Sequence, residues 1–315
     1  SHSNVVDEIR PATGWFYFSA GDRFREMAAK WGAEIADLVK QVGGGNMRLA
    51  IDRCNPEGLR ELEKHGVEVF NGEELMEMAR LVKCEEEIKA MKCAIAACDR
   101  SIDVMRKHMV PGIMEQDLWG YLHHANITRG GEWIETRLMA SGPRCNPWFQ
   151  ECSSRKIEAG DLVAFDTDLI GSYGICVDIS RTWLCGDLAP SAEQKEIYQM
   201  AYDQIMINTA CLKPGLTYRE LSHKSHQYDP RVFRHYSCLY HGVGLCDEFP
   251  CIYFPGAWEA YGYDGVLEPG HVICVESYVG RVSGGPGVKL EDQVLITEDG
   301  YELLSHYPYE DVLLG

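Results

Sequence analysis

The sequence lacks any apolar run near the roughly 20 residues that a membrane-spanning helix needs, and it is short of basic residues. Only 30 Lys and Arg stand against 48 Asp and Glu in 315 residues, a formal net charge of −18 at pH 7. A nucleic-acid or anionic-membrane surface needs clustered Lys and Arg, so we expect neither partner. No signal peptide is visible, which favours a cytoplasmic protein.

The sequence also lacks a CxxC pair, although it has 13 cysteines. An odd number cannot all pair within one chain, and several cysteines lie inside apolar patterns, as at Cys93, Cys98 and Cys274. This usage predicts reduced, buried thiols in a cytosolic protein rather than a disulfide framework.

What is present is an ordinary globular composition, 45% hydrophobic and 25% charged. We expect two domains. Residues 1–82 alternate strand-like and helix-like segments, with strands over 15–18, 49–51 and 67–70 and helices over 23–42 and 56–65. This pattern predicts an α/β domain that is part of a larger one. Residues 83–315 form the second domain.

The second domain contains an apparent duplication. Apolar residues at alternating spacings of three and four predict a helix over 88–105, and a capping box at Ser191 predicts another over 191–213. Each helix ends at a Pro-Gly pair, at 111–112 and 214–215, and each is followed by a hairpin of apolar strands. We therefore predict an α+β fold with two similar halves related by a pseudo-twofold axis.

Both hairpins carry acids on apolar strands. The first contains Asp166, Asp168 and Asp178, and the second contains Glu276 and Glu291. Burying a carboxylate costs several kcal/mol unless it is paired or binds a metal. The few basic residues nearby cannot neutralise all five, whereas two divalent cations bring roughly four positive charges. The pattern predicts a dinuclear metal centre.

Each acid taken alone has a plainer explanation. Asp168 would cap a turn, Asp178 would pair with Arg181, and Glu291 would lie on a solvated edge. A nitrogen ligand is expected from His241, since it lies between the hairpins beside glycines that let backbone approach closely.

These motifs resemble the creatinase/prolidase/methionine-aminopeptidase family, which has the pita-bread fold. The resemblance covers residues 77–304, including Asp178-Ile179-Ser180-Arg181-Thr182, His241-Gly242-Val243-Gly244 and Leu290-Glu291-Asp292-Gln293-Val294. It implies metal ligands at Asp178, His241, Glu276 and Glu291, with a first aspartate from the Asp166/Asp168 pair.

The chain departs from the peptidases of that family at three places. Thr167 stands between two aspartates, and no histidine follows either the Ser-Gly-Pro motif at 141–143 or the glycine-rich motif at 241–244. These departures, with Asn146-Pro147-Trp148-Phe149-Gln150-Glu151-Cys152, resemble the dimethylsulfoniopropionate (DMSP) lyases of the DddP type. That resemblance implies a homodimer with two divalent metal ions, iron first and Mn, Co or Zn as alternatives.

The implied reaction cleaves DMSP to dimethyl sulfide and acrylate by α-proton abstraction and β-elimination. Asp247 is the expected general base and Tyr236 an assisting residue. Aromatic faces suit a sulfonium cation, and the candidates are Trp148, Phe149 and Trp258. The main alternative is an Xaa-Pro aminopeptidase or dipeptidase on the same centre; a creatinase-like hydrolase and a metal-free binding module remain further alternatives.

Overall fold

The computed structural model describes residues 6–315, and the chain divides into two compact units, Ser1–Ala79 and Arg80–Gly315. The first unit contains α1 (Tyr17–Ala20), α2 (Phe24–Val42), β1 (Arg48–Ile51), α3 (Pro56–Lys64), β2 (Glu68–Asn71) and most of α4 (Gly72–Arg80). Its two strands pair in parallel, and its small core centres on Ala36, Leu62 and Val67.

The strand predicted over 15–18 is wrong, because Tyr17–Ala20 forms the short helix α1. The aromatic run has no strand beside it to bury its side chains, and Phe16, Tyr17 and Phe18 are exposed. The helix predicted over 23–42 and the strands over 49–51 and 67–70 agree with α2, β1 and β2.

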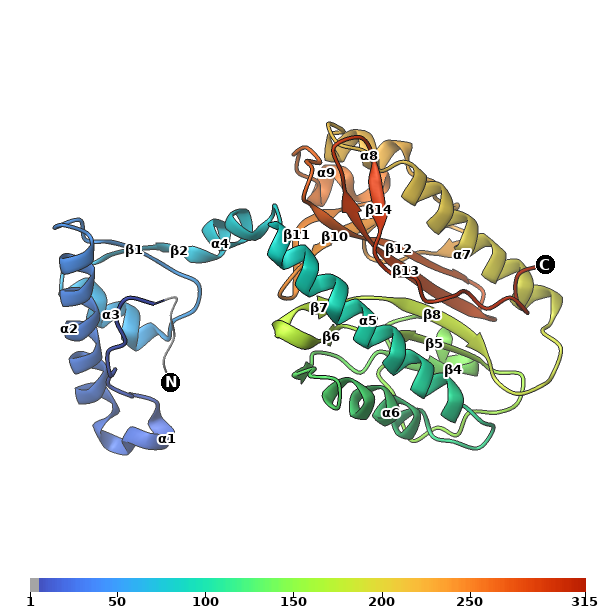
Figure 1. Ribbon diagram of the computed structural model, residues 1–315, viewed down its shortest axis with the longest axis horizontal. Coiled ribbons are helices and arrows are strands. Elements are labelled where there is room, and N and C mark those ends of the chain that lie inside the picture. The colour runs from blue at the N-terminus through green and yellow to red at the C-terminus, as the bar shows by residue number, and fades with distance from the viewer. Residues whose placement is uncertain (1–5) are drawn as a thin grey trace. The chain divides into compact units, whose positions relative to one another are not determined.

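The second unit combines two small sheets and one larger sheet with long helices (Figure 1). Its helices are α5 (Glu85–His108), α6 (Glu115–Ile127), α7 (Ala192–Ala210), α8 (Tyr218–Lys224) and α9 (Trp258–Tyr261). Its strands are β3 (Trp133–Ile134), β4 (Met139–Ser141), β5 (Leu162–Asp166), β6 (Leu169–Ile170), β7 (Cys176–Val177), β8 (Ser180–Leu184), β9 (Phe233–Arg234), β10 (Tyr240–Val243), β11 (Asp247–Ile252), β12 (Val272–Arg281), β13 (Gly287–Ile296) and β14 (Tyr301–Leu303).

The second unit repeats one pattern of backbone bonding. After α5, Gly112 N–H donates to the Ile157 carbonyl (2.7 Å), and after α7, Gly215 N–H donates to the Leu267 carbonyl (2.8 Å). Both glycines have positive φ, 97° and 83°, which glycine adopts without steric cost. Helix, Pro-Gly turn and strand entry therefore recur in the same arrangement, as the duplication predicts.

The two halves meet where β8 lies against β13. The backbone N–H of Lys289 donates to Thr182 Oγ1 (3.0 Å), and that hydroxyl donates to the Lys289 carbonyl (2.9 Å). Helices α5 and α6 lie on the side of the β4–β5–β8 sheet, and α7 packs along β12 and β13 (Figure 1). Strands carrying acids from both halves thus meet at the middle of the unit.

The first hairpin differs from its predicted form. Strand β5 pairs with β4 and β8, so Asp166 lies opposite Ser180, whereas β6 forms a separate sheet between β3 and β7. Asp168 has φ of 33°, which turns the chain out of β5 before a continuous hairpin can form.

All thirteen cysteines are free thiols, and Cys98 and Cys274 are buried. The prediction that Cys93 is buried is wrong, since it lies on the exposed side of α5. Within residues 6–315, no helix combines the length and apolar character required to cross a membrane.

Candidate metal centre

The three aspartates of the first half gather where β5 ends and β8 begins. Asp166, Asp168 and Asp178 are buried, and one carboxylate oxygen from each lies within 4.8 Å of the other two. Thr167, between the first two, points away and bonds to backbone: its hydroxyl donates to the Val177 carbonyl (2.7 Å) and accepts from Ile179 N–H (3.0 Å). This threonine fixes the segment that carries Asp178.

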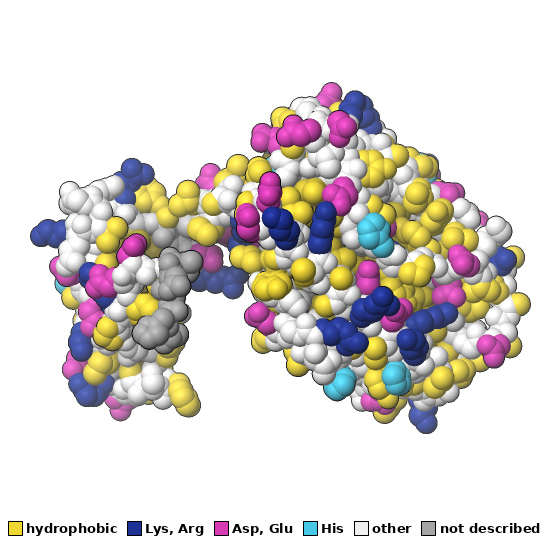
Figure 2. Space-filling view, in the orientation of Figure 1, with side chains coloured by type: hydrophobic (Ala, Val, Ile, Leu, Met, Phe, Trp, Pro, Cys, Tyr) yellow, Lys and Arg dark blue, Asp and Glu magenta, His cyan; other side chains and the backbone are white. Residues whose placement is uncertain are grey.

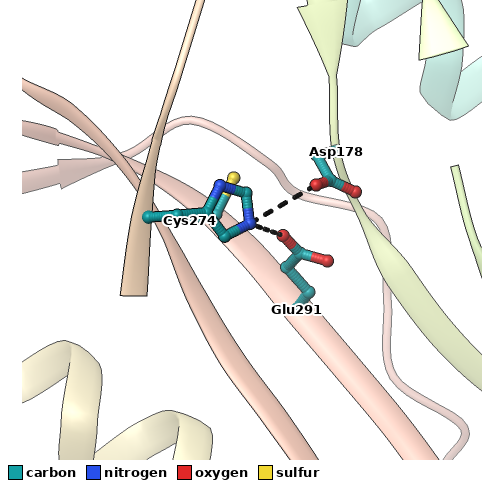
Figure 3. Close-up of side chains that lie close together, drawn as sticks. Asp178, Cys274 and Glu291 are labelled. Carbon is teal, nitrogen blue, oxygen red and sulfur yellow. Dashed lines mark ion pairs between the residues drawn. The ribbon is translucent and has the colours of Figure 1, made fainter. Parts of the chain in front are cut away.

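The acids of the second half come from neighbouring strands. Glu276 on β12 and Glu291 on β13 are directly opposite in the register, and both are fully buried. His241, on β10, directs Nε2 at Glu276 Oε1 (3.3 Å), Glu291 Oε1 (3.5 Å) and Asp178 Oδ2 (3.6 Å). Figure 3 shows Asp178 and Glu291 converging from the two halves.

Burial and neighbouring negative charges raise the pKa values of three of these acids. Burial, and then the charge of Glu291, raises the pKa of Glu276 to about 8. Burial and Asp166 raise the pKa of Asp168 to about 8, and burial with Glu291 raises that of Asp178 well above its usual range. Like charges at this distance resist joint ionisation.

One ammonium group reaches into the cluster. Lys289 Nζ lies 2.7 Å from Glu276 Oε2, 2.8 Å from Glu291 Oε2 and 3.1 Å from Asp166 Oδ2. Although burial opposes it, Lys289 and then His241 hold the pKa of Glu291 well below its usual value. Five carboxylates against one ammonium leave four negative charges to balance, which is the charge of two divalent cations.

The donor atoms fit such ions. Two buried oxygens, Asp178 Oδ1 and Glu291 Oε1, accept no hydrogen bond from any described residue, and buried polar atoms without partners are rare. Imidazole and carboxylate donors suit iron, manganese, cobalt and zinc. The candidate ligands form two groups that share Asp178: Asp166, Asp168 and Asp178 in one, and Asp178, His241, Cys274 and Glu291 in the other.

The simpler explanation for Asp178, a pair with Arg181, does not describe the structure. Arg181 Nη2 instead lies 2.8 Å from Asp292 Oδ1, and both side chains are buried. Asp292 points to the opposite face of β13 from Glu291, as alternation along a strand requires.

Asp247 begins β11 at the rim of the centre. Its Oδ1 lies 3.8 Å from His241 Nδ1, and its side chain is 60% exposed. Desolvation of the carboxylate beside the centre raises the pKa of Asp247, with His241 opposing the shift and the charge of Glu291 adding to it. The adjacent Glu248 turns inward to Lys83 Nζ (2.7 Å), so only Asp247 of this acidic pair lies on the open side.

The predicted aromatic residues lie in three places. Tyr236 lies against the centre, with its ring 4.4 Å from Lys289 Nζ, and Phe149 stacks on Tyr236 at 5.1 Å. Trp148 is buried beside Tyr278. Trp258 is not brought to this group: it packs in the core next to Arg219 and His223.

Sequence reasoning missed two members of the cluster. Lys289 is one of the few basic residues near the acids in the sequence, and Cys274 is expected there to be a buried packing residue. The available signal was strand alternation, because Lys289 and Cys274 each precede a candidate ligand by two residues on the same strand.

Known proteins are similar to this chain in sequence and in fold. The model of metallopeptidase family M24 matches residues 89–298. Two curated relatives bear the name dimethylsulfoniopropionate lyase DddP: that of Roseovarius nubinhibens is 51% identical and that of Roseobacter denitrificans 45% identical, each over 99% of this chain and 71% of its own length.

Solved structures agree with the fold. The Xaa-Pro dipeptidase from Bacillus anthracis is 27% identical, with a TM-score of 0.75 over 92% of this chain and 84% of that chain. The prolidase from Pyrococcus furiosus is 26% identical, with a TM-score of 0.71 over 87% and 79%. These findings confirm the pita-bread fold and the resemblance to the DddP group. The chain therefore belongs to metallopeptidase family M24 and, within it, to the group of the two DddP relatives.

Proposed function

We infer that this protein is a carbon–sulfur lyase that cleaves DMSP to dimethyl sulfide and acrylate. The observation that carries the inference is the 51% identity, over nearly the whole chain, to a relative named as that lyase. The site agrees with it, because an acid, Asp247, lies on the open side of the centre next to His241.

The metal ligands are proposed to be Asp166, Asp168, Asp178, His241, Glu276 and Glu291. When bound there, divalent cations neutralise the substrate carboxylate and stabilise the negative charge that develops as the α-proton leaves. We propose iron as the metal, with Mn, Co or Zn as alternatives, since the donor set suits each of them.

Asp247 is proposed to remove the α-proton of DMSP. The electrons of that C–H bond form the C=C bond of acrylate, and the C–S bond breaks with its electrons leaving on neutral dimethyl sulfide. A base must lie within hydrogen-bond reach of the proton that it removes, and Asp247 combines exposure with a raised pKa.

Aromatic rings are proposed to hold the sulfonium. Phe149 has a φ of 69°, a left-handed conformation that is unusual for a bulky residue. Its ring stacks on Tyr236, which itself contacts Lys289 of the acid cluster. This pair, with Trp148 beside it in sequence, offers faces to a soft cation. Trp258 has less support because it lies in the core beside Arg219.

A cytoplasmic homodimer is proposed for the whole protein. The thirteen free thiols suit a reducing compartment, and the homodimer rests on the resemblance to the DddP-type lyases. Light scattering of the purified protein measures the oligomeric state directly.

The function is tested by giving DMSP to metal-loaded protein and measuring dimethyl sulfide in the headspace and acrylate in solution. Asp247→Asn is expected to lower turnover by about 10²- to 10⁴-fold with unchanged metal content. The matched control is Asp187→Asn, an exposed acid in a loop, which should retain wild-type turnover. Cleavage of an Xaa-Pro dipeptide without release of dimethyl sulfide would favour the peptidase alternative and refute the lyase.

A further inference from the structure

Cys274 lies on the ligand-bearing face of β12. It precedes Glu276 by two residues, so the two side chains share a face, and its register partner on β10 is His241. The side chain is fully buried. Strand geometry therefore places a thiol directly beside the only imidazole of the cluster.

The thiol is within reach of three candidate ligands. Its Sγ and one donor atom each from Asp178, His241 and Glu291 all lie within 4.8 Å of one another. Figure 3 shows the sulfur of Cys274 against an imidazole ring, with the carboxylates of Asp178 and Glu291 on the other side of that ring. Four donors this close can surround one ion, because a metal lies about 2.0–2.3 Å from each nitrogen, oxygen or sulfur ligand.

The donors around Cys274 are also unsatisfied. Asp178 Oδ1 and Glu291 Oε1 are buried and accept no hydrogen bond from the described part of the chain. The amide of Gln293, whose register partner on β12 is Cys274, is fully buried and likewise without a hydrogen bond there. A cation at this point would contact Asp178 Oδ1, which accepts no hydrogen bond from residues 6–315, and Glu291 Oε1, whose polar neighbour is His241 Nε2 at 3.5 Å.

Another buried thiol shows the contrast. Cys145 is equally buried, but its Sγ donates to the backbone carbonyls of Ala140 (3.3 Å) and Leu162 (3.4 Å). Cys274 makes no such bond among residues 6–315. Cys145 is explained by packing and backbone bonding, whereas Cys274 points into a cluster of metal-binding groups.

We propose that Cys274 is a sulfur donor to the metal ion held by Asp178, His241 and Glu291. The inference rests on the metal centre of the proposed function. As the ion binds, the thiol proton leaves to solvent and a sulfur lone pair forms the bond to the metal. A thiolate favours iron, cobalt and zinc over manganese and magnesium, so this residue would set the metal preference of one position.

The test replaces the native metal with Co²⁺ in the full chain. We expect wild-type protein to show a sulfur-to-cobalt charge-transfer band in the near ultraviolet, and X-ray absorption to find a sulfur neighbour at about 2.3 Å. Cys274→Ser should lose both signals, and its affinity for Co²⁺ should fall by about 10- to 100-fold relative to its affinity for Mn²⁺. Cys145→Ser is the matched control and should retain both signals.

The outcomes separate this inference from the proposed function. Wild-type protein that binds cobalt without a sulfur neighbour refutes the role of Cys274, and this measurement does not depend on how any variant folds. A band that persists in Cys274→Ser also refutes it. If the sulfur signal is present but DMSP is not cleaved, the ligand assignment stands and the lyase fails; a protein that takes up no cobalt overturns both.

Discussion

Thr167 shows how one residue can order a site without touching its reactants. Its hydroxyl bonds to the backbone on both sides of Asp178, at Val177 and Ile179. The side chains before and after it, Asp166 and Asp168, then face Asp178 from the other segment. A neutral residue between two acids therefore holds the backbone that carries the third acid, Asp178.

A second single-residue effect concerns His123 on α6. Both of its ring nitrogens are buried without hydrogen bonds to described residues, and burial lowers the pKa of His123 to about 4. The unfolded chain takes up a proton near pH 6.5 but the folded chain does not, so stability is lost as pH falls from 6.5 towards 4. The loss should reach about 3 kcal/mol, measured by urea unfolding at several pH values.

The comparison variant His123→Gln cannot titrate there, so its stability deficit relative to wild type should shrink as the pH falls. His124→Gln, at the adjacent exposed position, should show the wild-type slope. Parallel pH curves for wild type and His123→Gln would contradict this account.

At the scale of elements, the alternation of side chains along β13 directs two sets of charged residues to opposite faces of the strand. Lys289 and Glu291 face the metal cluster, whereas Asp292 faces Arg181. The Asp292 carboxylate also accepts hydrogen bonds from Ser305 Oγ (2.7 Å) and from Tyr309. A single strand thus carries Lys289 and Glu291 of the site on one face and Asp292, one member of a buried structural pair, on the other.

Removing one member of the Arg181–Asp292 pair should lower the free energy of unfolding. Asp292→Ala leaves the Arg181 guanidinium buried without its carboxylate, and we expect the free energy of unfolding to fall by about 3–5 kcal/mol. Chemical denaturation measures it. Glu151→Ala, which breaks the mostly exposed pair with Arg137, should leave stability nearly unchanged; an equal loss in both variants would show that burial does not decide the effect.

Much of this layout follows from periodicity in the sequence. Acids on apolar strands, repeated after two Pro-Gly turns, predict the cluster because a buried carboxylate needs a counter-charge. The pairing of β5 with β8 does not follow, since the turn at Asp168 depends on a backbone conformation that its neighbours impose. Strand alternation places Cys274 on the same face as Glu276, but its apolar flanks suit a packing thiol as well as a ligand, so the sequence leaves its role open.

At the scale of the whole molecule, the charge of −18 has two parts. Acidic and basic side chains both appear across the face in Figure 2, as on an ordinary solvated surface. The buried acids differ, because five carboxylates share the single ammonium of Lys289, which contacts three of them. Bound metal should therefore add to the stability of the second unit.

Removing the metal tests this expectation, because the raised pKa values fix the direction in which stability should change with pH. The pKa values of Asp168 and Glu276 are raised to about 8, so the metal-free folded chain holds protons that the unfolded chain releases near pH 4. Stability of chelated protein should fall as pH rises from about 4 through 8. Added metal at 100 times its dissociation constant should restore about 2.7 kcal/mol per ion, read from melting temperature.

The same groups should release protons when metal binds at pH 7. Calorimetric titration in two buffers of different ionisation enthalpy counts the protons, and the number should decline towards pH 9. A number of released protons that does not vary with pH would contradict the raised pKa values of Asp168 and Glu276.

The ammonium of Lys289 supplies positive charge to the acid cluster without any metal ion. Because this ammonium is tethered to β13, three of the five carboxylates have a partner as soon as that strand is in place, whatever the supply of metal. We therefore expect folding to precede the recruitment of metal, so that scarcity of metal would leave a folded, inactive protein rather than a misfolded one.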